Sequence, residues 1–144
     1  GDVPTTRKWH ASPPPAGRGW NDIGYHRVIL NGHLKSKDTY NPALDGKIQQ
    51  GRADDVTGAH CPGYNARSLG ICLIGMLDDH APTDRQWAAL IDACVRLCKR
   101  YDIHHSDILG HRETPSGKKQ GKSCPGRKVD MSLLRKSVAD KLYE

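Results

Sequence analysis

A histidine and a cysteine near the carboxy-terminal end are the residues of this chain best suited to chemistry. His111 lies within residues 109–113 (LGHRE), and Cys124 lies within residues 122–126 (KSCPG). Zinc binds imidazole and thiolate readily, and a catalytic zinc takes three protein ligands with the fourth position left to water. The pair therefore predicts a metal-dependent hydrolase, provided that a third ligand is found.

Length and composition predict one globular domain over residues 1–144. No apolar run approaches the length needed to cross a membrane, so we expect no membrane insertion. The first residues have neither the basic start nor the apolar segment of a signal peptide. The five cysteines are odd in number and sparse, which favours synthesis in a reducing cytosol over a disulfide framework. Cys94, Cys98 and Cys72 are expected to be small buried hydrophobic residues.

The net charge of +6 favours anionic partners such as cell-wall polymers, acidic peptides or nucleic acid, although many soluble proteins carry a similar charge. Nucleic acid is disfavoured because the sequence has no helix-turn-helix, no RNP-like aromatic set and no paired metal knuckle. The local distribution of charge is more informative than the total. Basic residues crowd the segment around the cysteine, namely Lys118, Lys119, Lys122, Arg127 and Lys128.

Three segments have the pattern of strands. Tyr25–Leu30 alternates between faces and is rich in β-forming residues, and Lys47–Arg52 is a plausible short strand. Leu69–Gly75 is a continuous apolar run, which predicts a strand buried on both faces. Asn31-Gly32 and Asp45-Gly46 are both good hairpin-turn dipeptides, and the sequence does not choose between them.

Two helices and a further strand are expected towards the carboxy terminus. Thr83 and Gln86 form a capping box, and an apolar stripe at three- and four-residue spacings follows it. The stripe consists of Trp87, Leu90, Ile91, Cys94, Leu97, Cys98 and Tyr101. Asp130 is expected to cap a last helix, and Ile108–Gly110 to form a short strand leading into His111. In this last helix, one apolar face is expected to consist of Leu134, Val138 and Leu142. The fold class is therefore α/β or α+β, with a central sheet flanked by helices.

An ordered set of short motifs runs over nearly the whole chain. They are Trp9-His10, Gly19-Trp20, Asp22–His26, Asp45–Lys47, Gly51-Arg52, Gly58–His60, Gly63–Asn65, Ser68–Ile71, Gly110–Arg112 and Lys122–Pro125. This set resembles the zinc-dependent N-acetylmuramoyl-L-alanine amidases of phage and prophage, the type 2 amidases related to T7 lysozyme and to peptidoglycan recognition proteins. The resemblance implies a mixed sheet flanked by helices and favours Asp45-Gly46 as the hairpin, with Lys35–Leu44 as a longer loop.

The resemblance also implies roles for individual residues. The second and third zinc ligands of the family fall on His111 and Cys124, its active-site tyrosine on Tyr25 and its active-site lysine on Lys122. Two positions that line the family's substrate groove match His60 and Asn65. The implied partner is peptidoglycan, cleaved by a monomer that is made in the bacterial host cytoplasm and acts on the cell wall.

The first zinc ligand of the family is a histidine on an opening strand, and too few residues precede Tyr25 to hold that strand. We therefore expect the strand to lie upstream of Gly1. His10 or His60 completing the site is the less favoured alternative. Without a third ligand, the chain would be a non-catalytic peptidoglycan-binding module of the same fold. With four protein ligands, the zinc would be purely structural.

The expected reaction is hydrolysis of the amide between N-acetylmuramic acid and L-alanine. Zinc would lower the pKa of its bound water to about 7 and polarise the carbonyl. The Lys122 ammonium would stabilise the oxyanion by on the order of 3 kcal/mol, and Tyr25 would orient water or the intermediate by hydrogen bonding. Glu113 is expected to be a surface or supporting residue rather than a catalytic one.

Overall fold

The computed structural model describes residues 25–33, 40–55, 68–74, 77–119, 121 and 125–144. The chain divides into two compact units, Gly1–Ile74 and Gly75–Glu144, which are described in turn. Within these described ranges, no helix is long and apolar enough to cross a membrane.

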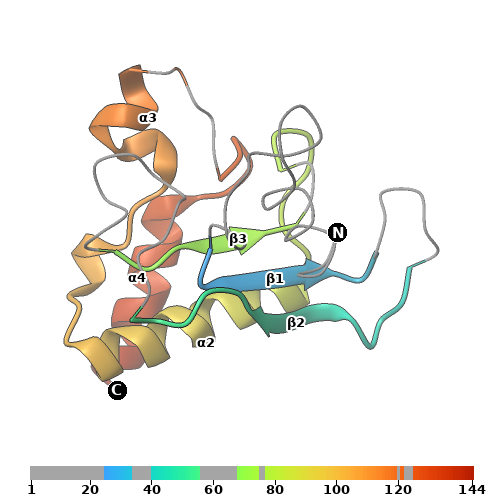
Figure 1. Ribbon diagram of the computed structural model, residues 1–144, viewed down its shortest axis with the longest axis horizontal. Coiled ribbons are helices and arrows are strands. Elements are labelled where there is room, and N and C mark those ends of the chain that lie inside the picture. Colours follow the sequence, from blue (N-terminus) through green and yellow to red (C-terminus); the bar gives the residue numbers. More distant parts are fainter. Residues whose placement is uncertain (1–24, 34–39, 56–67, 75–76, 120, 122–124) are drawn as a thin grey trace. The chain divides into compact units, whose positions relative to one another are not determined.

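The first unit contains a mixed sheet of three described strands in the order β2-β1-β3 (Figure 1). β1 (Arg27–Asn31) is antiparallel to β2 (Asp45–Gln50) and parallel to β3 (Ile71–Leu73). The predicted mixed sheet is therefore confirmed. The burial predicted for Leu69–Gly75 is wrong for β3, whose three residues are only partly buried. The fully buried run belongs to β1, where Val28, Ile29 and Leu30 are at most 1% exposed.

The connection between β1 and β2 spans residues 32–44, so neither predicted dipeptide forms a two-residue turn. Asp45-Gly46 instead opens β2, where Asp45 pairs with Asn31. The register shifts between Ile29 and Asn31 because β2 contains one extra residue there. Gly46 has a φ of +79°, a conformation that suits glycine and is typical of a β-bulge.

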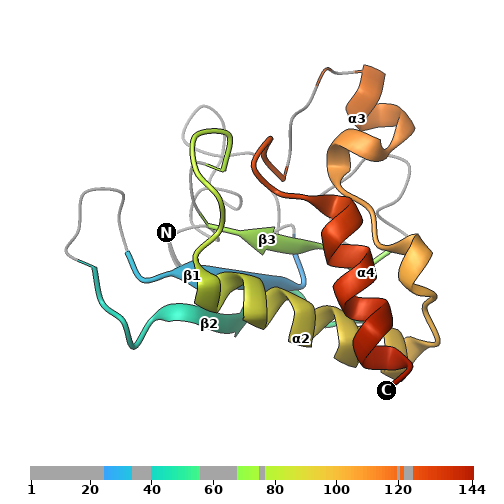
Figure 2. The same cartoon turned by 180° about the vertical axis from the view of Figure 1, so that it is seen from behind.

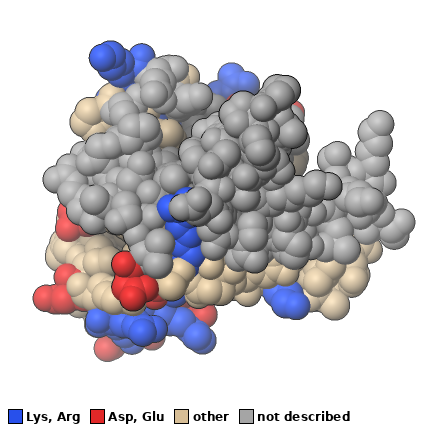
Figure 3. Space-filling view, in the orientation of Figure 1, with Lys and Arg blue, Asp and Glu red and all other residues tan. Residues whose placement is uncertain are grey.

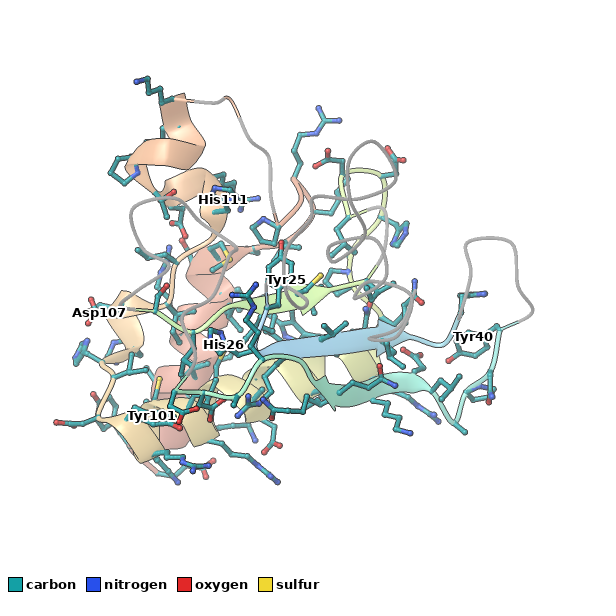
Figure 4. The ribbon with its side chains drawn as sticks, in the orientation of Figure 1. Tyr25, His26, Tyr40, Tyr101, Asp107 and His111 are labelled. Atoms are coloured by element: carbon teal, nitrogen blue, oxygen red, sulfur yellow. The ribbon has the colours of Figure 1, made fainter. Side chains whose placement is uncertain are left out.

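His26, just before β1, links that strand to both of its neighbours (Figure 4). Its side chain is 1% exposed. Its backbone N–H donates to the Gly70 carbonyl at 2.8 Å, and the Gly70 N–H donates to His26 Nδ1 at 3.0 Å. Its carbonyl accepts a hydrogen bond from the Gly51 N–H at 2.9 Å. The imidazole therefore acts as a buried acceptor that aligns the strand ends.

Substitution of His26 by leucine is expected to lower the free energy of unfolding by about 1–3 kcal/mol, because the buried Gly70 N–H would lose its acceptor. His26→Asn should lose less, since its amide oxygen can take the place of Nδ1. Urea denaturation of both variants measures the difference. Equal stability of the two variants would show that this hydrogen bond contributes nothing.

The second unit contains α2 (Asp84–Tyr101) and α4 (Met131–Leu142), which pack side by side (Figures 1 and 2). Both predicted caps are confirmed. The Gln86 N–H donates to Thr83 Oγ1 at 3.0 Å and the Thr83 N–H to Gln86 Oε1 at 3.1 Å. The Asp130 carboxylate accepts the Leu133 N–H at 3.0 Å.

The expected apolar face of α4 is buried at Leu134 and Val138 and partly buried at Leu142. In α2 the ends of the predicted stripe are less buried, with Trp87 intermediate and Tyr101 exposed.

Two thiols lie on the buried face of α2, as predicted. Cys94 and Cys98 are each 5% exposed and free. Burial raises the pKa of the Cys94 thiol to about 12, and burial likewise raises the pKa of Cys98. Cys72, in β3, is only partly buried, so the burial predicted for it is not complete.

Raising the pH should lower the free energy of unfolding of the wild type relative to that of the Cys94→Ala variant. The folded thiol stays protonated up to a pKa of about 12, whereas an unfolded thiol ionises near pH 8.5. The unfolded state therefore binds fewer protons between these values, and stability falls as the pH rises. In urea denaturation, the difference in free energy of unfolding between wild type and Cys94→Ala should change by roughly 2–3 kcal/mol from pH 8 to pH 10.5, against the wild type. A constant difference would contradict the raised pKa.

The strand predicted for Ile108–Gly110 is wrong. The chain forms a short 3-10 helix, η2 (His105–Asp107), then an extended stretch and a second 3-10 helix, η3 (His111–Glu113). Side chains take the backbone hydrogen bonds that a neighbouring strand would need. The Gly110 N–H donates to Glu113 Oε1, and Arg135 donates to the Ile108 carbonyl.

Candidate active site

His111 is the first residue of η3, and it lies beside the start of α3 (Pro115–Lys119) (Figure 4). Its Nε2 atom is shielded from solvent. Its carbonyl accepts hydrogen bonds from the Thr114 N–H at 3.1 Å and from Thr114 Oγ1 at 2.7 Å. The backbone of His111 is therefore held on its carboxy-terminal side by Thr114.

Gly117 fixes the same carbonyl from α3. Its N–H donates to Thr114 Oγ1 at 3.1 Å. A Cβ added at Gly117 would lie 1.8 Å from the His111 carbonyl oxygen, so only glycine permits this approach. This role of Gly117 was not predicted from the sequence. The available signal was a glycine inside a short helix, where it costs stability unless close backbone contact requires it.

Glu113 holds the backbone on the amino-terminal side of His111, at Gly110. Its Oε1 accepts the Gly110 N–H at 2.8 Å, and Arg135 donates to both of its carboxylate oxygens, at 2.8 and 2.9 Å. The hydrogen bond from Arg135, with that from Gly110, holds the pKa of the Glu113 carboxyl below its usual value. Glu113 is thus engaged with the scaffold, which agrees with its expected supporting role.

The segment that follows Cys124 lies against the residues on either side of His111. A Cβ on Gly110 would lie 2.9 Å from Pro125 Cδ, so the two are in close contact. Arg112 donates from Nη1 to the Gly126 carbonyl at 2.5 Å and from Nη2 to the Val129 carbonyl at 2.6 Å. Residues 125–129 are therefore held against residues 110–112 by one close contact and two hydrogen bonds.

Of the predicted site residues, the structure describes Tyr25 and His111. Tyr25 belongs to the first unit, where it packs against Val28 and Leu30 and its carbonyl accepts the Arg52 N–H at 2.8 Å. His111 belongs to the second unit. The remaining predicted site residues, together with the alternative ligand, lie outside the described residues: His60, Asn65, Lys122, Cys124 and His10. Among the described residues, no three histidine, cysteine or acidic side chains form a group that could hold a metal ion.

Positive charge accompanies the site, as predicted from the sequence. Lys118 and Lys119 are exposed on α3, and Arg127 and Lys128 are exposed after Cys124. A small patch of positive charge lies at the top left of the space-filling view, over α3 (Figure 3). In the sequence, these charges flank Lys122 and Cys124 on both sides.

A mixed sheet, a helical unit and a histidine turn fastened to the segment after a cysteine define an α/β protein of the amidase and peptidoglycan-recognition class. The family model described as N-acetylmuramoyl-L-alanine amidase matches residues 3–127. The chain belongs to this family.

Relatives and solved structures agree with this assignment. The chain is 32% identical to the endolysin of Escherichia phage T7 over 124 residues, which cover 83% of this chain and 66% of the endolysin. It is 33% identical over 117 residues to peptidoglycan-recognition protein LB of Drosophila melanogaster, covering 78% of this chain and 41% of that protein. The amidase LysC from Clostridium intestinale superposes with a TM-score of 0.68 at 28% identity, covering 85% of this chain and 68% of LysC. The matched part thus spans just under two thirds of the phage relative. The expected amidase fold is confirmed.

Proposed function

We propose that this chain is a zinc-dependent peptidoglycan hydrolase that cleaves the amide between N-acetylmuramic acid and the L-alanine of the stem peptide. The observation that carries the proposal is the fastening of residues 125–129 to residues 110–112. It supports a site in which His111 and Cys124 share one ion. Membership of the amidase family and similarity to phage endolysins support the bacterial cell wall as the place of action.

His111 and Cys124 would hold the zinc together with a third protein ligand. An imidazole nitrogen and a thiolate are a donor pair that fits this metal, and His111 Nε2 already lies in a shielded environment. When bound, zinc supplies an activated water and polarises the substrate carbonyl.

The chain's own residues would bind and orient the muramyl peptide. Lys122 would donate a hydrogen bond to the carbonyl oxygen as negative charge develops on it. Tyr25 would orient the water or the tetrahedral intermediate, and His60 and Asn65 would line the groove. Water adds to the carbonyl carbon, the C–N bond breaks, and the nitrogen of L-alanine leaves with a proton.

Hydrolysis of a purified muramyl peptide tests the proposal. Mass spectrometry should detect a free peptide that begins with L-alanine, together with the muramyl sugar. A chelator should stop its release and added zinc should restore it. Turnover unaffected by the chelator would rule out the metal-dependent mechanism.

A peptidoglycan-binding module without turnover is the second candidate. Sequence similarity to a peptidoglycan-recognition protein favours it. Binding of the muramyl peptide without release of free peptide, in the presence of excess zinc, would identify this function.

Replacement of Lys122 by alanine is expected to leave zinc binding intact and to slow turnover by about 100- to 1000-fold, the cost of losing one oxyanion donor. Zinc affinity and steady-state turnover are measured on the same preparation. Lys119→Ala is the matched control, because it removes a neighbouring exposed charge and should leave turnover near wild type. Unchanged turnover in Lys122→Ala would remove this residue from the mechanism.

A further inference from the structure

Arg112 follows the proposed metal ligand His111 directly, yet its side chain contacts a different part of the chain. Its guanidinium donates to two carbonyls, those of Gly126 and Val129, which lie 14 and 17 positions away in the sequence. The planar fork of an arginine presents donors in a fixed geometry, so two carbonyls bound by one guanidinium are held at a set separation. The contact therefore sets the spacing of the two carbonyls and also ties residues 126–129 to Arg112.

The segment that Arg112 contacts is also held by residues 77 and 78, which do not belong to η3. Gly126 has a φ of +128°, a conformation that favours glycine, and it lies against the backbone of Leu77. The Lys128 N–H donates to the Leu77 carbonyl at 2.9 Å. Residues 126–129 are thus held by Leu77, by Asp78, which accepts the Arg127 N–H at 2.7 Å, and by Arg112. Of these three, only Arg112 belongs to η3, which begins with His111.

We infer that Arg112 is a positioning residue that sets the distance between the two segments carrying the proposed zinc ligands. The inference rests on the proposed function and deepens it. Arg112 does not touch the metal or the substrate in this scheme. It acts by holding residues 126–129 against η3, which limits how far the two segments can move apart before an ion arrives. Such preorganisation raises metal affinity because less ordering is left to be done on binding.

Zinc affinity of Arg112→Ala, measured by competition with a chromophoric chelator, tests the inference independently of turnover. The variant should bind zinc about 10- to 100-fold more weakly than wild type, the usual effect of losing a supporting partner. Val138→Ala is the stability control, because Val138 is fully buried in α4 and has no contact with zinc in the scheme. The zinc affinity of Val138→Ala should stay within about threefold of wild type. Substitutions at distant, independent sites usually affect each other by only about a few tenths of a kcal/mol.

The outcomes separate the inference from the proposed function. Wild-type affinity in Arg112→Ala would overturn the inference, and so would an equal loss in Val138→Ala, because general destabilisation would then explain the effect. Should Arg112→Ala not fold, Arg112→Lys is judged by the same criteria, since an ammonium cannot reproduce the fork. A wild-type protein that binds no zinc would overturn the proposed function itself.

Discussion

Cys124→Ala is expected to abolish both zinc binding and amide hydrolysis. The thiolate is proposed to bind the ion directly, so its loss should cost more than the roughly 10- to 100-fold expected for a supporting partner. Titration with a chromophoric chelator measures the affinity, and release of free stem peptide measures turnover. Both should fall to the level of a sample without metal.

A buried thiol elsewhere in the same unit provides the control. Cys98 lies on the buried face of α2 and is free. Cys98→Ala should lower stability through the small cavity it creates while zinc affinity stays at the wild-type value. Retained zinc and full turnover in Cys124→Ala would remove the cysteine from the ligand set, and the hydrolase proposal would lose its metal site.

Gly117→Ala is expected to displace His111. The added methyl carbon would lie 1.8 Å from the His111 carbonyl oxygen and 2.7 Å from its carbonyl carbon. Both atoms are backbone, so neither can rotate away, and α3 or η3 must move. We expect a loss of stability on the order of 3 kcal/mol and, because the imidazole moves with its backbone, at least about a tenfold loss of zinc affinity.

Gly121 separates this clash from the general effect of replacing a glycine. Its φ is +64°, yet a Cβ there would meet nothing within 4 Å. Gly121→Ala should therefore cost only the strain of a left-handed residue, about 1 kcal/mol, and should not affect zinc. Thermal unfolding and the same metal titration compare the two variants. Equal effects would show that the contact with His111 is unimportant.

Elements whose signals are local were predicted correctly. The capping box of Thr83 and Gln86 and the cap at Asp130 depend on hydrogen bonds that span only three residues. The strands near residues 25–30 and 47–52 appear as β1 and β2, with ends shifted by a few residues. In the caps, the residues that form the contact lie only three positions apart, so the local sequence is enough to predict the contact.

Predictions that depended on distant partners were less accurate. The apolar pattern of Ile108–Gly110 suggested a strand, but a strand also needs a neighbour. Here Arg135 takes the Ile108 carbonyl and Glu113 takes the Gly110 N–H. Likewise, the apolar run at residues 69–75 predicted burial on both faces, whereas β3 is only partly buried. Neither outcome is encoded in the local sequence, because each depends on where other segments lie.

The sequence by itself determined the chemical donors of the proposed site and the family. His111 and Cys124 were identified from residue type alone, since few side chains can bind zinc. The tertiary structure alone decided what holds them. Gly117 supports the His111 backbone through a missing Cβ, and Arg112 reaches two carbonyls beyond Cys124. The glycine inside a short helix was only a weak signal for the first contact, and nothing in the sequence signalled the second, because close approach and hydrogen-bond direction arise only when separated segments pack together.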